Sequence, residues 1–352
     1  MRKIVSLIAA VTISITGMYC PKKTVYSYVA NSSDIKIMAI GDSITDGYGV
    51  AGSYRKYLYD ELRKKGYSID MVGSNGGNYM MRFVDIETGE SFFYDNDNTG
   101  YSGYAVKEYP GRNGILETLR STNCLSTCDP DIVILQIGTN NIIDNHNRDE
   151  SYNDAKELIN YILDNISEDS TLFVTTIPDL DPNREEVYNW FSNYRHSPDW
   201  QTNYSDEQAA ASVDLALREY NSDIAELVQK MSESAVSTGD GKGPYIKNAY
   251  VSEVITDVKT QLMDGVHPNN KGYKLMGQYW AELIDSYLKN KRPKEDEYQF
   301  RDLLKLKKYL LGVSTNINGE HLLARYDINS DNCVDIFDLI LLRKIMIKNS
   351  SI

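Results

Sequence analysis

The segment DIKIMAIGDSITDGYG (residues 34–49) joins an apolar run to a glycine and a serine, and it decides the fold. Residues 34–40 are predicted to form a buried strand because they end in an unbroken apolar stretch. Gly41 then lets the chain turn sharply, which puts Ser43 just beyond the carboxyl end of that strand. Ligands bind at this edge of open α/β sheets, so Ser43 is a candidate catalytic residue.

Short apolar runs continue to alternate with amphipathic stretches beyond this segment. The predicted strands are 34–40, 68–73, 131–137 and 171–177, and the predicted helices are 54–65, 152–166, 209–232 and 270–288. Such alternation is typical of a parallel sheet covered by helices on both faces. The predicted fold class is therefore a doubly wound, three-layer α/β/α sandwich.

A carboxylate and a histidine follow the predicted helix 209–232. Asp264 lies three residues before His267, which is one of four histidines in the chain. A histidine that takes a proton from a serine hydroxyl needs an acceptor on its other ring nitrogen. We therefore predict a catalytic triad of Ser43, His267 and Asp264.

Two further sites supply hydrogen-bond donors for an oxyanion. Asn140 follows the predicted strand 131–137, which we expect beside the strand that precedes Ser43. Gly103 lacks a Cβ and lets the backbone approach a substrate. Prearranged donors of this kind stabilise the tetrahedral intermediate of acyl transfer by roughly 3–4 kcal/mol each.

These motifs together resemble the four sequence blocks of the SGNH, or GDSL-type, hydrolases. The matching residues are GDS (41–43), Gly103, GTN (138–140) and DGVH (264–267), in the family's order. The resemblance implies a flavodoxin-like sandwich over residues 34–288. It also implies that Ser43 is the nucleophile, and that the Ser43 N–H, the Gly103 N–H and the Asn140 side chain form the oxyanion hole. No metal or cofactor is expected for catalysis.

The family pattern also concerns two residues close to the predicted oxyanion donors. Gly100 competes with Gly103, but the family places a small residue directly before its glycine, as Ser102 is here. The family usually has Asp after the third-block Asn, where this chain has Asn141, so the local geometry there is in question. The other histidines lack an acidic partner at this spacing and are predicted to lie at the surface: His146, His196 and His321.

Composition restricts the class of partner. The net charge is −13, and no large Lys/Arg cluster follows the N-terminus. Nucleic acid and membrane surfaces are therefore not expected as partners, and a neutral substrate fits better. Residues 1–30 carry Arg2 and Lys3 before an apolar run too short to span a membrane, which predicts an export signal and a secreted protein.

Four cysteines are too few for a fold built on disulfides. Cys124 and Cys128 are four residues apart, so they either form a disulfide or pack as two small side chains, and both alternatives stay open. Cys333 is expected to be unpaired.

The composition changes after the predicted closing helix. Residues 289–296 are charged, contain a proline and are predicted to be a linker. Residues 327–338 then place oxygen donors at the spacing of a calcium-binding loop. The predicted ligands are Asp327, Asn329, Asp331, Asp335, Asp338 and the carbonyl of Cys333.

Residues 302–311 and 338–347 share a charge and apolar pattern, which is an internal repeat. The repeated unit, over residues 297–352, resembles a type I dockerin, a small all-α calcium-binding module. The resemblance implies that Ile336 and Phe337 contact a cohesin of a scaffoldin. The first repeat has Pro293 and Glu295 at ligand positions, so one calcium site is expected rather than two.

A dockerin implies a cellulosomal enzyme that acts on plant cell walls, and the large domain resembles carbohydrate esterase family 3. We therefore expect an acetyl xylan esterase with acetylated plant polysaccharide as substrate. The alternatives are a deacetylase for another polymer, a lipase or thioesterase, and a non-catalytic carbohydrate-binding component. Aromatic residues between 188 and 204 form either a packed insertion, the favoured reading, or a sugar-stacking wall.

Overall fold

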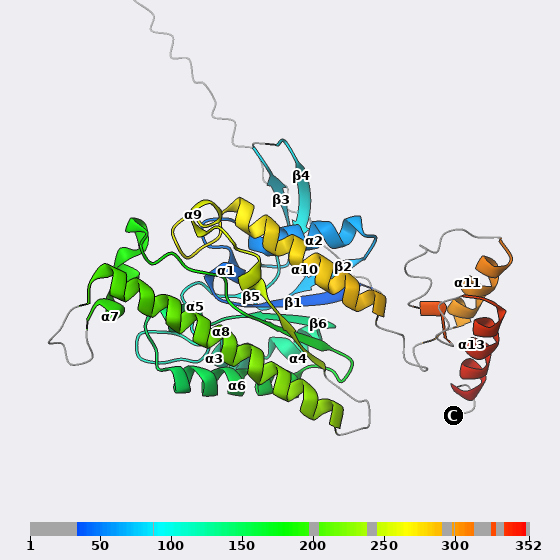
Figure 1. Ribbon diagram of the computed structural model, residues 1–352. Coiled ribbons are helices and arrows are strands. Elements are labelled where there is room, and N and C mark those ends of the chain that lie inside the picture. Colours follow the sequence, from blue (N-terminus) through cyan, green and yellow to red (C-terminus); the bar gives the residue numbers. More distant parts are fainter. Residues whose placement is uncertain are drawn as a thin grey trace, which may run out of the picture.

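The computed structural model describes residues 34–86, 88–196, 204–237, 245–290, 298, 300–312, 325–328 and 334–349. Within these residues a parallel sheet has the strand order β2-β1-β6-β7-β8, and β5 also pairs with β1 (Figure 1). The strands are β1 (Ile35–Gly41), β2 (Ile69–Val72), β5 (Thr99–Gly100), β6 (Ile132–Gln136), β7 (Thr171–Thr175) and β8 (Tyr245–Ala249). The predicted α/β fold with a parallel sheet is confirmed, and the predicted strand 131–137 contains the central strand.

Helices cover both faces of this sheet, as Figure 1 shows. One face packs against α2 (Ser53–Lys64) and α10 (Asn270–Asn290); on the other lie α3 (Ile115–Thr122), α4 (Cys124–Cys128), α6 (Arg148–Asn165) and α8 (Asp206–Ser237). Neighbouring residues of β1 point into different layers, because Ile37 belongs to the core under α2 and α10 whereas Met38 belongs to the opposite core. Burial on both faces explains why the central strands are almost entirely apolar.

The short elements that carry the predicted site residues lie beyond the carboxyl ends of the strands. Helix α1 (Ser43–Asp46) follows β1, and α5 (Thr139–Ile143) follows β6. Strands β1 and β6 pair in parallel, with Gly41 opposite Gln136, so both helices begin at the same edge. The connection after β8 passes through η2 (Val251–Glu253) and α9 (Val258–Gln261) before it reaches the loop that holds Asp264 and His267.

The short helices between the main elements and four of the strands were not predicted from the sequence. Strands β3 (Met80–Val84) and β4 (Ser91–Asp95) form an antiparallel hairpin outside the main sheet. Strand β5 has only two residues, and β8 at the sheet edge mixes apolar with polar residues. None of these segments has the long apolar run that marks the buried central strands.

Cys124 and Cys128 are both free thiols in the structure, so the alternative of two packed side chains describes them. Cys124 is buried in the core beneath α6, and burial raises the pKa of the Cys128 thiol. Among the described residues, no helix is long and apolar enough to cross a bilayer. The predicted export segment and residues 291–296 of the predicted linker lie outside the described residues, whereas Lys289 and Asn290 belong to α10.

The described residues after α10 include two helices that pack on each other, α11 (Phe300–Leu310) and α13 (Ile336–Asn349). A small core lies around them, and its buried members are Tyr298, Leu306, Tyr326 and Leu342. Arg325 makes two hydrogen bonds of 3.1 Å to the Asp302 carboxylate, which ties the start of the second repeat to α11. The predicted internal repeat therefore corresponds to two helices with a shared core.

Candidate active site

Ser43 occupies the first position of α1, immediately after β1. Asp42 caps this helix, because its Oδ1 accepts a hydrogen bond of 3.0 Å from the Ile44 N–H. Burial raises the pKa of the Asp42 carboxyl, against the opposing effect of that backbone hydrogen bond. Gly41 is required by close packing, since a Cβ there would lie 2.1 Å from the Gln136 carbonyl oxygen. The turn thus presents Ser43 directly beside the end of β6.

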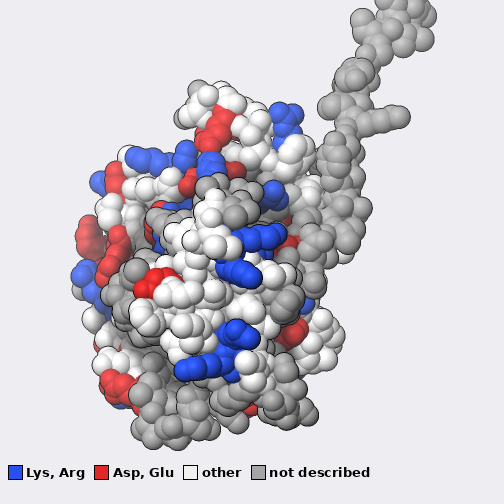
Figure 2. Space-filling model, turned by 90° about the vertical axis from the view of Figure 1, so that its right-hand side faces the viewer, with Lys and Arg blue, Asp and Glu red and all other residues white. Residues whose placement is uncertain are grey.

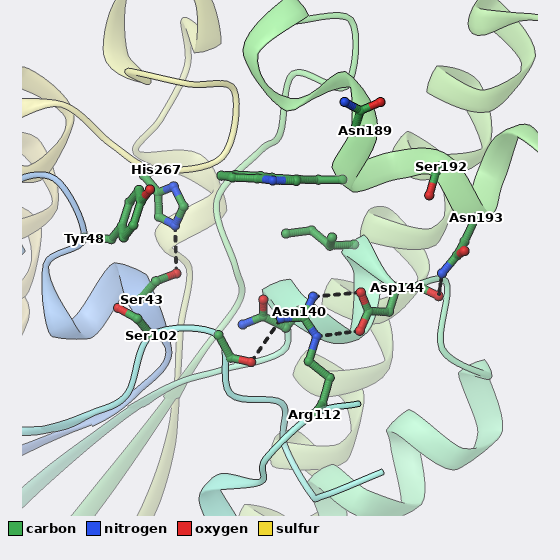
Figure 3. A pocket seen from close by; sticks show the side chains of 13 residues that line it. Ser43, Tyr48, Ser102, Arg112, Asn140, Asp144, Asn189, Ser192, Asn193 and His267 are labelled. Atoms are coloured by element: carbon green, nitrogen blue, oxygen red, sulfur yellow. Dashed lines mark hydrogen bonds and ion pairs between the residues drawn. The ribbon is translucent and has the colours of Figure 1, made fainter. Parts of the chain in front are cut away.

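The structure brings the three predicted triad residues into one hydrogen-bonded line. His267 Nε2 lies 2.8 Å from Ser43 Oγ, and His267 Nδ1 lies 2.7 Å from Asp264 Oδ2 (Figure 3 shows the first bond). Asp264 Oδ1 accepts hydrogen bonds from the backbone N–H groups of Val266 and His267. Gly265 makes the sharp bend between them, at a φ of +86° that favours glycine.

Asp264 is held in its charged form. Burial alone would raise the pKa of this carboxyl, but hydrogen bonds from the His267 ring and backbone and from the Val266 N–H bring the net pKa below its usual value. An ionised Asp264 accepts from Nδ1–H, so Nε2 faces Ser43 with its lone pair. This is the arrangement that a general base requires.

The predicted oxyanion donors line the same pocket as Ser43. Asn140 stands in the first turn of α5, and its Nδ2 donates one hydrogen bond of 2.8 Å to the Tyr104 carbonyl, which leaves the second amide hydrogen for a ligand. Gly103 has a φ of +82°, and a Cβ there would have only the far end of Arg112 as a neighbour. Gly100 instead packs against α1, with Asp46 N 2.5 Å from its added Cβ, so the pocket is lined by Gly103 and not by Gly100.

Asn141, which departs from the family pattern, supports the same region. Its Oδ1 accepts a hydrogen bond of 3.1 Å from the Val106 N–H, and its Nδ2 lies 3.5 Å from the Ser151 hydroxyl. The side chain therefore links the loop after Gly103 to α5. An amide oxygen performs the accepting role here, and the local hydrogen bonding is complete without a carboxylate.

The pocket has a volume of about 530 Å³, and its lining combines polar side chains with aromatic and aliphatic ones. Tyr48 and Trp190 flank the His267 ring, with centroid distances of 4.4 and 5.7 Å. The lining residues are Ser43, Tyr48, Ser102, Gly103, Arg112, Asn140, Ile143, Asp144, Asn189, Trp190, Ser192, Asn193 and His267 (Figure 3). Ile143 is the one aliphatic side chain among them.

Sequence reasoning missed an ion pair in this lining. Arg112 and Asp144 form a two-pronged contact, with Nε to Oδ2 at 2.6 Å and Nη2 to Oδ1 at 2.8 Å. The hydrogen bonds to Asp144 raise the pKa of Arg112 above its usual value. The two residues are 32 positions apart on different loops, and no spacing rule in the sequence connects them.

The aromatic segment after residue 185 contains both buried core residues and a residue that lines the pocket. It begins with η1 (Glu185–Phe191) and α7 (Ser192–Arg195). Phe191 and Tyr194 are buried in the core and form a packed insertion, whereas Trp190 is 38% exposed and lines the pocket. Tyr188 stacks against the Arg195 guanidinium away from the pocket lining, and Trp200 lies outside the described residues.

His146, predicted to lie at the surface, is half-buried, with its side chain 16% exposed. Its ring stacks on Tyr109 at 4.2 Å, and its Nε2 lies 3.6 Å from Glu150 and 3.9 Å from Asp154. His146 lies in the connection before α6, and Glu150 belongs to the first turn of that helix. His196 is exposed, and His321 lies outside the described residues.

Half of the predicted calcium ligands, Asp327, Asp335 and Asp338, lie among the described residues. Asn329, Asp331 and Cys333 lie outside the described residues, and the described part of the chain has no group of three or more His, Cys, Asp or Glu side chains placed to hold a metal. Asp338 is buried and accepts hydrogen bonds from the Ile328 and Asp335 N–H groups, which brings both ends of the loop together. Two buried carboxylates, Asp327 and Asp338, at the ends of one loop fit a hard cation.

Fold and site together define a serine hydrolase of the SGNH type. Residues 37–280 match the GDSL-like lipase/acylhydrolase family, and the chain belongs to it. A multidomain esterase of Ruminococcus flavefaciens is 32% identical over 323 residues, covering 90% of this chain and 35% of that protein. The chain thus spans about a third of the length of that relative.

Several solved structures are similar to this chain at lower sequence identity. An acetyl esterase variant with an acetate ion and a carbohydrate esterase family 3 protein from Talaromyces cellulolyticus are each 19% identical, with a TM-score of 0.45, over 72% of this chain and 97% of theirs. A psychrotrophic esterase from Pseudoalteromonas sp., inhibited by monoethylphosphonate, is 15% identical over 73% of this chain and all of its own, with a TM-score of 0.45.

Replacing Asp264 with Asn tests the role of its charge. The Asp264→Asn protein should fold normally but lose on the order of 10³- to 10⁴-fold in kcat toward a small acetyl ester, because the imidazolium loses its counter-charge. Asp257→Asn is the matched control, since Asp257 caps α9 outside the pocket lining. Equal kcat values for the two variants would contradict the assignment of Asp264.

Proposed function

We propose that this protein is a secreted acetyl esterase that removes acetyl groups from xylan. The observation that carries the proposal is the hydrogen-bonded line from Ser43 through His267 to Asp264, of which Ser43 and His267 line the pocket. Acyl transfer to a serine requires this order of nucleophile, base and acceptor.

The reaction proceeds in two halves. His267 Nε2 takes the Ser43 proton as Oγ attacks the ester carbonyl carbon, and the ionised Asp264 stabilises the imidazolium. The tetrahedral intermediate then breaks its bond to the sugar oxygen, which receives the proton from His267. Water repeats the sequence on the acetyl-serine, with His267 as base and then acid, and acetate leaves with Ser43 restored.

Three donors converge on the carbonyl oxygen during both halves. They are the Ser43 N–H, the Gly103 N–H and the free amide hydrogen of Asn140. Because Asn140 is already held by the Tyr104 carbonyl, little reorganisation is needed when charge develops.

The pocket favours a sugar over a long acyl chain. Its lining has amide, hydroxyl and paired charged groups that can exchange hydrogen bonds with sugar hydroxyls, and Trp190 offers an aromatic ring. A long acyl chain would need an apolar tunnel, whereas Ile143 is the one aliphatic side chain among the described lining residues. Figure 2 shows acidic and basic side chains together on one face of the molecule.

We infer further that residues 297–352 dock the enzyme onto a cohesin in a calcium-dependent way, as expected for a cellulosomal component. Ile336 and Phe337 at the start of α13 are 54% and 62% exposed, which suits an apolar contact. The match to the multidomain esterase covers more of the chain than residues 37–280, so it reaches beyond the catalytic region. Export through residues 1–30 is consistent with this role.

Acetate release from acetylated xylan tests the catalytic proposal. Ser43→Ala should lower the rate by at least about 1,000-fold, whereas Ser121→Ala, at the exposed end of α3, should leave it unchanged. The parent should release acetate faster from xylan than from acetylated mannan or pectin, and should hydrolyse an octanoyl ester poorly. A Ser43→Ala protein as active as the parent would end the proposal, and a preference for another polymer would overturn the xylan assignment.

Calcium titration of the full chain tests the docking proposal. The parent should bind one Ca²⁺ per chain, and Asp331→Ala should weaken binding at least about tenfold because one carboxylate ligand is lost. Glu295→Ala alters the corresponding position of the first repeat and should change nothing. Capture of a cohesin should be lost on chelation. Unchanged calcium affinity in Asp331→Ala, or capture that persists in chelator, would contradict the proposal.

A further inference from the structure

Hydrogen bonds join the nucleophile helix to the loop that carries Gly103. Asp46, the last residue of α1, accepts a bond of 2.6 Å from the Ser102 hydroxyl at its Oδ2. Ser102 directly precedes Gly103, so the Gly103 N–H belongs to the peptide bond between these two residues. The bond from Ser102 to Asp46 therefore anchors this peptide to the helix that begins with Ser43. This bond fixes the first two predicted oxyanion donors relative to each other.

Arg112 anchors the other side of Gly103. Its Nη1 donates a bond of 3.2 Å to the Gly103 carbonyl, while Nε and Nη2 hold the Asp144 carboxylate (Figure 3). Asp144 directly follows α5, and its N–H donates to the Asn140 carbonyl at 3.0 Å. One guanidinium thus connects Gly103 to the helix that carries the third donor, Asn140.

Two further contacts stiffen this connection. Asn140 Nδ2 returns a bond of 2.8 Å to the Tyr104 carbonyl, which closes a ring of bonds around Gly103. The Tyr109 hydroxyl donates to Asp144 Oδ2 at 3.1 Å, so both oxygens of that carboxylate are held. A planar guanidinium with two parallel bonds has a defined orientation, which a single ion pair would not impose.

We propose that Arg112 and Asp144 are positioning residues, which clamp the loop of Gly103 to the helix of Asn140 and thereby set the spacing of the oxyanion donors. The inference rests on the proposed function, since it concerns the same site. Donors stabilise an oxyanion only when they are already aligned with the place where its charge develops. Gly103, with a positive φ and no Cβ, has no side chain of its own to hold that alignment.

The same residues line the pocket, so a direct contact with the sugar is the competing role. The two roles separate in kinetics. Loss of a positioning clamp weakens an interaction made in the transition state and lowers kcat, even for a small ester that has no sugar. Loss of a sugar contact raises KM for the polymer and leaves the small ester unaffected.

Arg112→Lys is the test, because lysine keeps the charge but cannot hold Gly103 and both Asp144 oxygens at once. With 4-nitrophenyl acetate we expect kcat to fall about tenfold and KM to change less than about twofold. Arg148→Lys is the matched control, since Arg148 forms an equivalent two-pronged pair with Asp223 between α6 and α8, outside the pocket lining. That control should have the kcat of the parent.

A second pair of variants guards against a loss of folding. Ser102→Ala removes only the hydroxyl that bonds Asp46, at an exposed position, and should also lower kcat with little change in KM. Asp144→Asn should also lower kcat, and the double variant Arg112→Lys, Asp144→Asn should be no slower than the slower of its two single variants, because each change breaks the same clamp. Thermal unfolding of every variant shows which of them are folded.

The possible outcomes are distinct. Parent kcat in folded Arg112→Lys and Ser102→Ala overturns the clamp, and so does a raised KM confined to the polymer. If instead Ser43→Ala retains full activity, the proposed function itself fails. A tenfold loss of kcat in both single variants, with the parent rate in Arg148→Lys, supports the clamp.

Discussion

The hydrogen bond between His267 Nε2 and Ser43 Oγ is the contact on which the rest of the site depends, and it joins residues 224 positions apart. It forms because β1 ends where the loop before α10 returns to the sheet, so the fold itself brings the two side chains together. Asp42 fixes the turn at one end, and Asp264 fixes the ring at the other. Asp42 and Asp264 each orient one side chain, whereas the parallel sheet brings Ser43 and His267 within reach of each other.

Short-range patterns in the sequence predict much of this arrangement. The strands at the centre of the sheet are buried on both faces, so their apolar runs are unmistakable, and Asp264 and His267 lie close enough in sequence to indicate a pair. The edge strand β8 and the hairpin β3–β4 are partly solvated and lack that signal. Arg112 and Asp144 meet only through the tertiary fold, and no local rule links loops that far apart.

The pocket lining contains two charged side chains whose charges offset each other. Arg112 and Asp144 place two full charges at the wall, but their close pairing leaves little net field for an ionic ligand. The aromatic rings of Tyr48 and Trp190 enclose His267, and polar amides complete the lining. These features are the basis for proposing a neutral, hydroxyl-rich leaving group and a small acyl group. In the same region the Asn141 side-chain oxygen accepts a hydrogen bond from the Val106 N–H, at the position where the family usually has a carboxylate.

The central claim is that the Ser43 hydroxyl is activated by His267, and labelling with an organophosphonate followed by peptide mass mapping tests it most directly. The account predicts one adduct per chain, on the peptide that contains Ser43, and a strongly reduced labelling rate in His267→Ala. An adduct on another residue, or equal labelling of the parent and His267→Ala, would contradict it.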